Sequence, residues 1–224
     1  MKIILLPGLD GTGLLFRKLL TYIPYKIECT VISLDDLEGD TFLKQANEIA
    51  NKFEDDEILL VGESYSGRIV YELCGLLQEK IKGIVLLASF ISSPSLISKM
   101  ASYVPLFFLN PNPMSKWLLH LIGFNMKGSS NLVDAVFFSL SLSNKKKLKI
   151  RLKNIAHLDT PIKVYHYPVT YIMPDRDNLI NKNSINILQS VFVNCELTTL
   201  KGGHFIGQSN PFDCAQIILR AFYT

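Results

Sequence analysis

Short, almost uninterrupted apolar runs alternate along this chain with segments whose apolar residues recur at helical spacing. A run such as Ile-Leu-Leu-Val at residues 58–61 has no polar face, so a strand formed from it must be covered on both sides. Six runs are predicted to be strands: residues 2–6, 28–33, 58–61, 84–88, 169–173 and 196–200. Because helical patterns separate them, we predict an α/β fold with about six mostly parallel strands and helices on both faces.

The composition agrees with a folded chain of this kind. The 224 residues are 48% hydrophobic and 19% charged, which excludes a disordered chain and allows a sizeable core. The predicted helices lie near residues 14–20, 41–53, 66–77, 184–190 and 211–222. The cysteines are Cys29, Cys74, Cys195 and Cys214. Their wide spacing favours reduced structural thiols over a zinc site or a disulfide framework.

The first residues and the hydropathy of the sequence do not suggest export or membrane insertion. Only four apolar residues lie between Lys2 and Pro7, whereas a signal peptide needs a longer apolar stretch. No uncharged apolar run approaches the ~20 residues of a membrane-spanning helix. The sequence therefore predicts a cytoplasmic protein without a transmembrane segment.

The alternation is interrupted between residues 90 and 160, which is too long a stretch for a structureless loop. Helical patterns recur there at residues 96–100, 116–122 and 132–142. We predict an α/β core at residues 1–90 and 160–224 and a mostly helical cap at residues 91–159, over one edge of the sheet. Open parallel sheets bind ligands at the carboxyl ends of their strands, so the candidate site is sought there.

The first candidate residue is Ser64, in the sequence Gly-Glu-Ser-Tyr-Ser-Gly at residues 62–67. This segment lies between a predicted strand and a predicted helix, the context of a nucleophile elbow. Small residues on both sides allow a sharp turn that exposes the serine hydroxyl, and the helix dipole favours negative charge there. The alternative is an ordinary serine in a glycine-containing turn.

A histidine and an acid follow two later strands. His204 comes after two glycines and the last predicted strand, whereas His120, His157 and His166 are interpreted as ordinary histidines. An acid can hold such a histidine in the right tautomer, and Asp175 and Asp177 both follow the strand at residues 169–173. We favour Asp177 and interpret Asp175 as part of an acidic turn.

Acyl-transfer chemistry also needs backbone N–H groups directed at the oxyanion of the tetrahedral intermediate. Tyr65, directly after Ser64, is predicted to supply one, and Leu9, in the glycine-rich loop after the first strand, the other. The rival interpretation of this loop as a phosphate cradle fails on spacing. Gly8, Gly11 and Gly13 form neither a dinucleotide fingerprint nor a lysine-bearing phosphate loop.

Four sequence blocks together resemble bacterial esterases of the α/β-hydrolase superfamily: LLPGLDGTGLLF, VGESYSG, PVTYIMPDRDNLI and LKGGHFIGQSNP. The first two also resemble plant phytyl ester synthase-like acyltransferases. The chain order Ser64, Asp177, His204 is that of the superfamily's catalytic triad. The resemblance implies an α/β-hydrolase fold and places Asp177 as the acid, although Pro7-Gly8 stands where many members have His-Gly.

The predicted cap is apolar and basic. Its large apolar residues are Val104, Leu106, Phe107, Phe108, Leu109, Trp117, Leu118, Leu119, Leu121, Ile122, Phe124, Phe137 and Phe138. They either pack the cap onto the core or favour an apolar acyl or alkyl group in the pocket. Residues 89–158 hold nine lysines and arginines against one acid, Asp134.

Six of these basic residues lie close together: Lys145, Lys146, Lys147, Lys149, Arg151 and Lys153. With apolar residues at helical spacing, they indicate an amphipathic helix with one basic face. That face is either simply solvated or a docking surface for an acidic acyl-carrier protein or an anionic membrane. Nucleic acid is not expected, because no aromatic stacking pattern accompanies the charge.

These features predict a serine carboxylesterase that needs no metal or cofactor and acts on an ester with an apolar acyl chain. The resemblance extends to the methyl esterase that acts on pimeloyl-carrier protein in biotin synthesis, and a carrier-linked methyl ester suits a basic, apolar cap. One alternative is a lipase, thioesterase or acyltransferase acting on lipid. Another is a catalytically inactive hydrolase fold that serves as a binding module.

Overall fold

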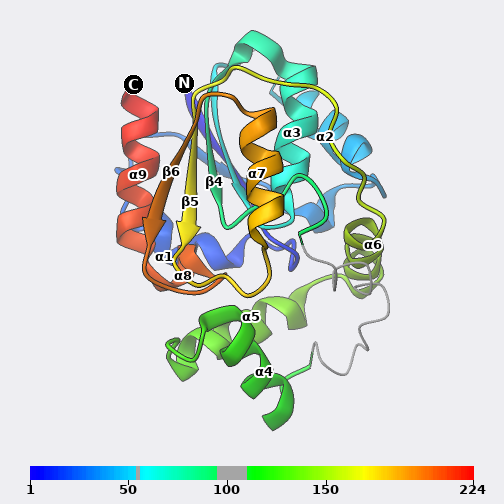
Figure 1. Ribbon diagram of the computed structural model, residues 1–224, viewed down its shortest axis with the longest axis vertical. Coiled ribbons are helices and arrows are strands. Elements are labelled where there is room, and N and C mark those ends of the chain that lie inside the picture. Colours follow the sequence, from blue (N-terminus) through cyan, green and yellow to red (C-terminus); the bar gives the residue numbers. More distant parts are fainter. Residues whose placement is uncertain (54–55, 95–109) are drawn as a thin grey trace.

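The computed structural model describes residues 1–53, 56–94 and 110–224 (Figure 1). Parallel strands form a six-stranded sheet in the order β2-β1-β3-β4-β5-β6. The strands are β1 (Lys2–Leu6), β2 (Cys29–Val31), β3 (Ile58–Glu63), β4 (Ile81–Leu87), β5 (Val169–Pro174) and β6 (Cys195–Leu200). Because every pair is parallel, all six carboxyl ends lie at the same end of the sheet.

Helices cover both faces of this sheet (Figure 1). On one face α1 (Arg17–Leu20) packs against α9 (Pro211–Tyr223), and on the other α2 (Phe42–Ala50) packs against α3 (Ser66–Leu77). Further helices are η1 (Leu14–Phe16), η2 (Leu34–Asp36), η3 (Gln78–Lys80), α7 (Lys182–Val191) and α8 (Ile206–Ser209). The predicted α/β architecture with six parallel strands is confirmed.

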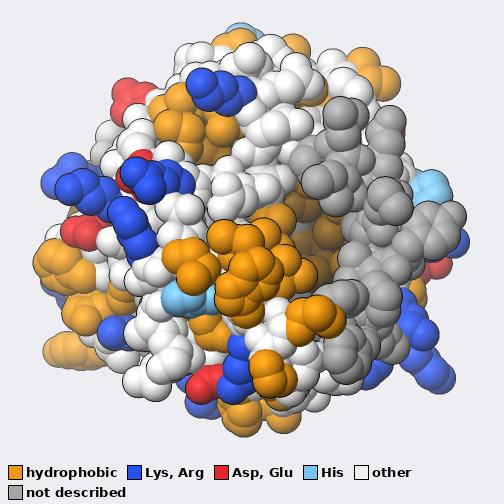
Figure 2. Space-filling model, turned by 60° about the horizontal axis from the view of Figure 1, so that its bottom comes forward, with side chains coloured by type: hydrophobic (Ala, Val, Ile, Leu, Met, Phe, Trp, Pro, Cys, Tyr) orange, Lys and Arg blue, Asp and Glu red, His pale blue; other side chains and the backbone are white. Residues whose placement is uncertain are grey.

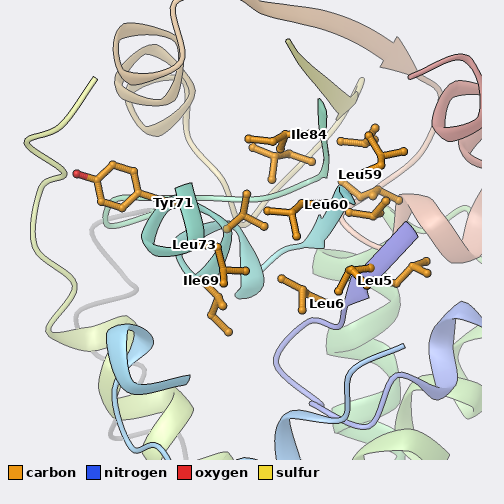
Figure 3. Close-up of a cluster of buried hydrophobic side chains, with 14 of the residues drawn as sticks. Leu5, Leu6, Leu59, Leu60, Ile69, Tyr71, Leu73 and Ile84 are labelled. Carbon is orange, nitrogen blue, oxygen red and sulfur yellow. The ribbon is translucent and has the colours of Figure 1, made fainter. Parts of the chain in front are cut away.

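The core forms because the central strands are apolar on both faces. All six residues of β3 are buried, and so are six of the seven residues of β4. Figure 3 shows leucine and isoleucine side chains of β1, β3, β4 and α3 gathered in one cluster. The cysteine thiols are unpaired, and Cys74 and Cys214 are part of this core.

Side-chain caps explain where several helices begin. The Thr41 hydroxyl accepts a hydrogen bond from the Lys44 N–H at the start of α2, and the Asn181 side chain accepts one from the Ser184 N–H at the start of α7. Such caps satisfy N–H groups that have no partner within the helix. The predicted bounds differ from the observed ones by a few residues, as at β4, where buried Ile81 extends the strand toward its amino end.

Between β4 and β5 the chain forms α4 (Pro113–Phe124), α5 (Ser130–Leu142) and α6 (Lys145–Ala156), which we call the cap helices. In Figure 1, α4 and α5 lie beyond the carboxyl ends of the strands, at the edge of the sheet that carries Ser64. They enclose a second apolar cluster built around Phe124 and Phe137. The helix predicted at residues 96–100 lies outside the described residues.

Candidate functional site

Ser64 lies at the sharp turn between β3 and α3, and its backbone is left-handed, with φ of 48°. A non-glycine residue in this conformation stores strain and is concentrated at functional sites. The turn is held by hydrogen bonds from Ser64 N to Leu87 O (3.0 Å) and from Gly67 N to Ser64 O (3.1 Å). A Cβ at Gly67 would lie 2.7 Å from Phe90 O, so the close packing of α3 excludes a side chain there.

The structure brings the side chains of Ser64, His204 and Asp177 within hydrogen-bond distance of one another, with His204 in the middle. Ser64 Oγ lies 2.8 Å from His204 Nε2, and His204 Nδ1 lies 2.9 Å from Asp177 Oδ2. His204 is buried, with 6% of its surface exposed. Hydrogen bonding of Nδ1 to a carboxylate leaves Nε2 free to accept the proton of the serine hydroxyl.

Asp177 is held by its own turn as well as by His204. Its Oδ1 accepts hydrogen bonds from the N–H groups of Leu179 (2.8 Å) and Ile180 (3.1 Å). Burial opposes ionisation of this carboxyl, but the attraction of His204 and these hydrogen bonds outweigh burial and lower its pKa. Asp177 therefore carries a negative charge beside the histidine at neutral pH.

His204 responds in the opposite direction. Burial lowers its pKa, but the charge of Asp177, the hydrogen bond to it and the nearby Glu63 together raise the pKa above the ordinary histidine value. The imidazolium form is thus favoured by its surroundings. A base that is stabilised when it gains a proton is suited to take one from a hydroxyl.

Two glycines allow the cap to approach His204. A Cβ at Gly203 would lie 2.5 Å from Gly123 O, and Gly123 O accepts a hydrogen bond from Phe205 N (3.2 Å). The Phe205 ring also stacks on Phe124, with ring centroids 5.1 Å apart. The carboxyl end of α4 therefore packs directly against the loop that carries the histidine.

Asp175 does not reach His204. Its Oδ1 accepts a hydrogen bond from Gly202 N (2.8 Å), and Arg176 N donates to Gly202 O (3.3 Å). Asp175 is thus more than an acidic turn residue, because it ties the loop after β5 to the loop that carries His204.

The loop after β1, at residues 7–13 and called the β1 loop below, lies beside the nucleophile turn. A Cβ at Gly8 would lie 3.6 Å from Ser64 Cβ. Within the described residues, the N–H groups of Leu9 and Tyr65 donate no hydrogen bond. Both of the predicted oxyanion donors therefore lie on segments next to Ser64, and their N–H groups are available to bind an oxyanion.

Several side chains that were not singled out from the sequence hold the β1 loop. The Ser66 hydroxyl donates to Pro7 O (2.5 Å), and the Ser143 hydroxyl donates to Asp10 O (2.6 Å). The buried Asp10 carboxylate accepts hydrogen bonds from Thr12 and Ser139 through the same oxygen. The loop is therefore anchored both to α3 and to the cap helix α5.

Glu63 is a further residue that sequence reasoning missed. Its Oε1 accepts a hydrogen bond from Gln208 Nε2 (2.9 Å), and within the described residues its buried Oε2 has no partner. Burial, reinforced by Asp10 and opposed by the bond from Gln208, raises the pKa of Glu63 to about 7. An acid at the end of an otherwise apolar strand was the available signal.

The predicted basic face of α6 is correct only in part. Leu148, Arg151, Leu152 and Ile155 form its buried side, so Arg151 cannot contact a partner and its assignment to the docking surface is wrong. Their spacing of i, i+3, i+4 and i+7 marks one helix face and was the signal that the charge pattern obscured.

The five lysines of this helix differ in whether their ammonium groups are bound within the protein. Lys147 is half-buried and donates hydrogen bonds to the carbonyl oxygens of Asp35 and Leu37 (2.7 Å each), while Lys145 donates to Leu140 O (2.6 Å). Lys145, Lys146, Lys149 and Lys153 are exposed, although the Lys145 ammonium is bound to Leu140 O. The basic surface available to a partner is thus smaller than predicted.

The apolar residues of the cap are also divided. Phe124 and Phe137 are buried in the second cluster, whereas Trp117 and Phe138 are more than half exposed. The predicted pocket residues Val104, Leu106, Phe107, Phe108 and Leu109 lie outside the described residues. Figure 2 shows hydrophobic side chains gathered on the face formed by the cap.

None of the described helices combines the length and hydropathy that crossing a lipid bilayer requires.

Comparison with solved structures identifies the fold. The chain is similar over its full length to a thermophilic esterase from Thermogutta terrifontis (TM-score 0.80, 11% identity, 89% of that chain covered). It is also similar over its full length to the RedJ thioesterase of prodiginine biosynthesis from Streptomyces coelicolor (TM-score 0.71, 16% identity, 90% covered). An α/β-hydrolase fold protein from Chitinophaga pinensis matches 98% of the chain (TM-score 0.76, 12% identity, 88% covered).

These similarities establish that the chain has the α/β-hydrolase fold, as the sequence predicted. No protein-family model and no curated protein matches its sequence. Because a fold hosts many unrelated functions, the function must be argued from the site. Among the described residues, no group of three or more His, Cys, Asp or Glu side chains is arranged to hold a metal ion.

Proposed function

We propose that this protein is a serine hydrolase that cleaves carboxylic esters through an acyl-enzyme. One observation carries the proposal: Ser64 Oγ, His204 Nε2 and Asp177 Oδ2 are linked by contacts of 2.8 Å and 2.9 Å, with the serine on a left-handed turn. This combination supplies a nucleophile, its base and the group that orients the base.

The reaction follows from the positions of the atoms. Ser64 Oγ attacks the ester carbonyl while His204 Nε2 takes its proton, and Asp177 stabilises the resulting imidazolium. The N–H groups of Leu9 and Tyr65 bind the oxyanion of the tetrahedral intermediate. Collapse expels the alcohol, which receives the proton from His204, and water then hydrolyses the acyl-enzyme by the same steps in reverse order.

The proposed substrate is an ester with an apolar acyl chain. The described cap helices place a cluster around Phe124 and Phe137 in contact with Leu9 and with Phe205, the neighbour of His204. Apolar surface next to the reacting groups favours an acyl chain over a charged acid.

Labelling and hydrolysis test the proposal together. A fluorophosphonate should add one phosphonyl group to Ser64, located by peptide mass spectrometry, and nitrophenyl esters of increasing chain length should be hydrolysed. An inactive binding module would show neither reaction. An acyltransferase would label in the same way but would transfer the acyl group to an added long-chain alcohol faster than to water.

A carrier-protein-linked ester, such as a pimeloyl-carrier-protein methyl ester, is a more specific candidate. The exposed Lys146, Lys149 and Lys153 favour it, because they present positive charge to an acidic partner. Replacing all three with glutamate should lower kcat/KM for the carrier-linked ester and leave kcat/KM for a small neutral ester unchanged. Exposed charges steer encounter, so added salt should weaken the wild-type reaction in the same selective way.

A matched control replaces the exposed Lys18, Lys26 and Lys52, which lie on other elements, with glutamate. Equal losses in the two triple variants would assign the effect to overall charge. Equal losses on both substrates in the α6 variant would mean that the cap itself was disturbed. Either result would exclude docking through α6 while leaving the ester hydrolase intact.

A further inference from the structure

Arg151 is a buried cation whose role the hydrolase chemistry does not yet explain. It lies on α6 and has 0% of its surface exposed. Its Nε donates to Leu9 O (2.8 Å), and its Nη2 donates to Asp10 O (3.0 Å) and to Ser143 Oγ (3.0 Å). The guanidinium thus binds two successive carbonyl groups of the β1 loop.

An ion pair completes this arrangement. Arg151 Nη1 lies 2.9 Å from Asp35 Oδ1, and the Asp35 side chain is 15% exposed. Because charges lose hydration when they are buried, apolar side chains of similar volume often stabilise a protein at least as well as such a pair. Stability alone is therefore a weak explanation for an arginine at this position.

The β1 loop leaves space for the guanidinium. A Cβ at Gly11 would lie 2.6 Å from Arg151 Cζ, so any larger residue would displace the charged group. The same glycine has φ of 73°, which residues with a side chain rarely adopt. The glycine therefore serves both the turn and the close approach of Arg151.

The turn that Arg151 supports fixes the direction of the Leu9 N–H. Gly8 O accepts a hydrogen bond from Gly11 N (3.1 Å). The carbonyl of Gly8 and the N–H of Leu9 belong to one planar peptide group and point in opposite directions. The hydrogen bonds that hold Gly11 and the carbonyl groups of Leu9 and Asp10 prevent the Gly8–Leu9 peptide from rotating. A rotated peptide would present the Gly8 carbonyl oxygen where the Leu9 N–H is needed.

The same helix also contacts the second proposed oxyanion donor. Asn154 Nδ2 donates to the Tyr65 hydroxyl (3.0 Å), which in turn donates to Gln45 Oε1 (3.3 Å). Residues of α6 thus contact both Leu9 and Tyr65, whose N–H groups face the candidate nucleophile in the proposed reaction.

We propose that Arg151 is a positioning residue: by binding the carbonyl groups of Leu9 and Asp10, it fixes the β1 loop so that the Leu9 N–H is directed at the oxyanion. The inference rests on the proposed hydrolase function. It makes the cap helix α6 part of the catalytic apparatus, although none of its side chains touches the reacting atoms.

Loss of this support should affect the transition state more than substrate binding. Removing one oxyanion donor typically lowers kcat by two to three orders of magnitude. Arg151→Met should therefore lower kcat about 100-fold with little change in KM. Arg151→Lys keeps the charge opposite Asp35 but cannot make all four contacts, so we expect a smaller loss of about tenfold that also falls on kcat.

The experiment measures kcat, KM and the inhibition constant of a trifluoromethyl ketone, whose tetrahedral adduct requires the oxyanion donors. Arg68 provides the control, because it is also buried and paired, with Glu72 and Asp159, but does not contact the β1 loop. Arg68→Met and Arg68→Lys should change thermal stability without a selective loss of kcat or of ketone affinity.

The outcomes are distinguishable. A selective loss of kcat and of ketone affinity in the Arg151 variants, absent from the Arg68 variants, supports the proposal. If Arg151→Met does not fold, Arg151→Lys decides: unchanged kcat and ketone affinity would overturn the positioning role. A wild-type protein that hydrolyses no ester would instead refute the hydrolase function itself.

Discussion

The two sides of the candidate site are held by different parts of the chain. Ser64, Asp177 and His204 each follow a strand, and backbone hydrogen bonds at the strand ends contribute to their positions, such as those from the N–H groups that bind Asp177. The β1 loop also follows a strand, but side chains from distant segments hold it. Its carbonyls bind Ser66 of α3, Ser143 at the end of α5 and Arg151 of α6.

This difference separates two ways of building a precise site. Where the sheet itself fixes the geometry, the side chains are positioned mainly by the strand ends and the turns that follow them. Where a loop must direct an N–H group, most of the fixing groups come from the cap, so the cap does more than cover the carboxyl ends of the strands. We call Ser64, Asp177 and His204 the triad side, and the β1 loop with the groups that hold it the β1-loop side. We expect substitutions on the triad side to abolish ester hydrolysis and substitutions on the β1-loop side to reduce it.

The largest effects should come from the triad. Ser64→Ala and His204→Ala should each lower kcat about a millionfold, because they remove the nucleophile or its base. Circular dichroism and thermal unfolding should show an intact fold. Either variant that keeps a tenth of the wild-type ester hydrolysis would refute the triad and with it the distinction between the two sides.

The second effect tests which acid completes the triad. Asp177→Asn should lower kcat about 10,000-fold, because an amide favours the wrong histidine tautomer. Asp175→Asn should cost far less, because its oxygen can still accept the hydrogen bond from Gly202 N. Steady-state kinetics of the two variants decide the assignment, and the reverse ranking would give the catalytic role to Asp175.

The same division explains what could be predicted from the sequence. The strands were readable because segments such as β3 are apolar on both faces, and Ser64 and His204 were readable because each follows such a strand. Arg151 was misassigned because its charge matches that of the lysines around it. Its partners at Leu9, Asp10 and Asp35 are more than 100 residues away in the chain, so only the folded structure could reveal them.

Glu63, next to Ser64 on the triad side, should show a pH-dependent effect on stability. Its pKa is about 7 when folded, against an ordinary value of 4.5. Above pH 4.5 the unfolded chain releases this proton while the folded protein retains it, so the free energy of unfolding falls as pH rises and levels off above pH 7. Glu63→Gln removes this loss and should raise the free energy of unfolding at pH 8 by about 3 kcal/mol.

At pH 4, where the carboxyl is mostly protonated in both states, the same substitution should change stability little. Gln208 can rotate its amide to accept a hydrogen bond from the new side chain, so no buried partner is lost. Urea unfolding at the two pH values measures the difference. An equal change at both values would show that the effect comes from packing and not from the charge of Glu63.

The smallest predicted effect lies where the two sides meet. Ser66 is the first residue of α3 and follows the nucleophile by two positions, yet its hydroxyl donates to Pro7 O of the β1 loop (2.5 Å). Ser66→Ala removes this link and leaves the triad side chains in place. A single neutral hydrogen bond contributes about 1 kcal/mol, so kcat should fall about fivefold to tenfold with KM unchanged.

Ser89→Ala is the matched control, because the Ser89 hydroxyl is equally buried and donates to Gly62 O at the same turn without touching the β1 loop. A loss of kcat confined to Ser66→Ala would show that the β1 loop depends on this bond. Equal losses in both variants would mean that the turn around Ser64 is sensitive to any buried hydroxyl, and the two sides of the site would then not be separable.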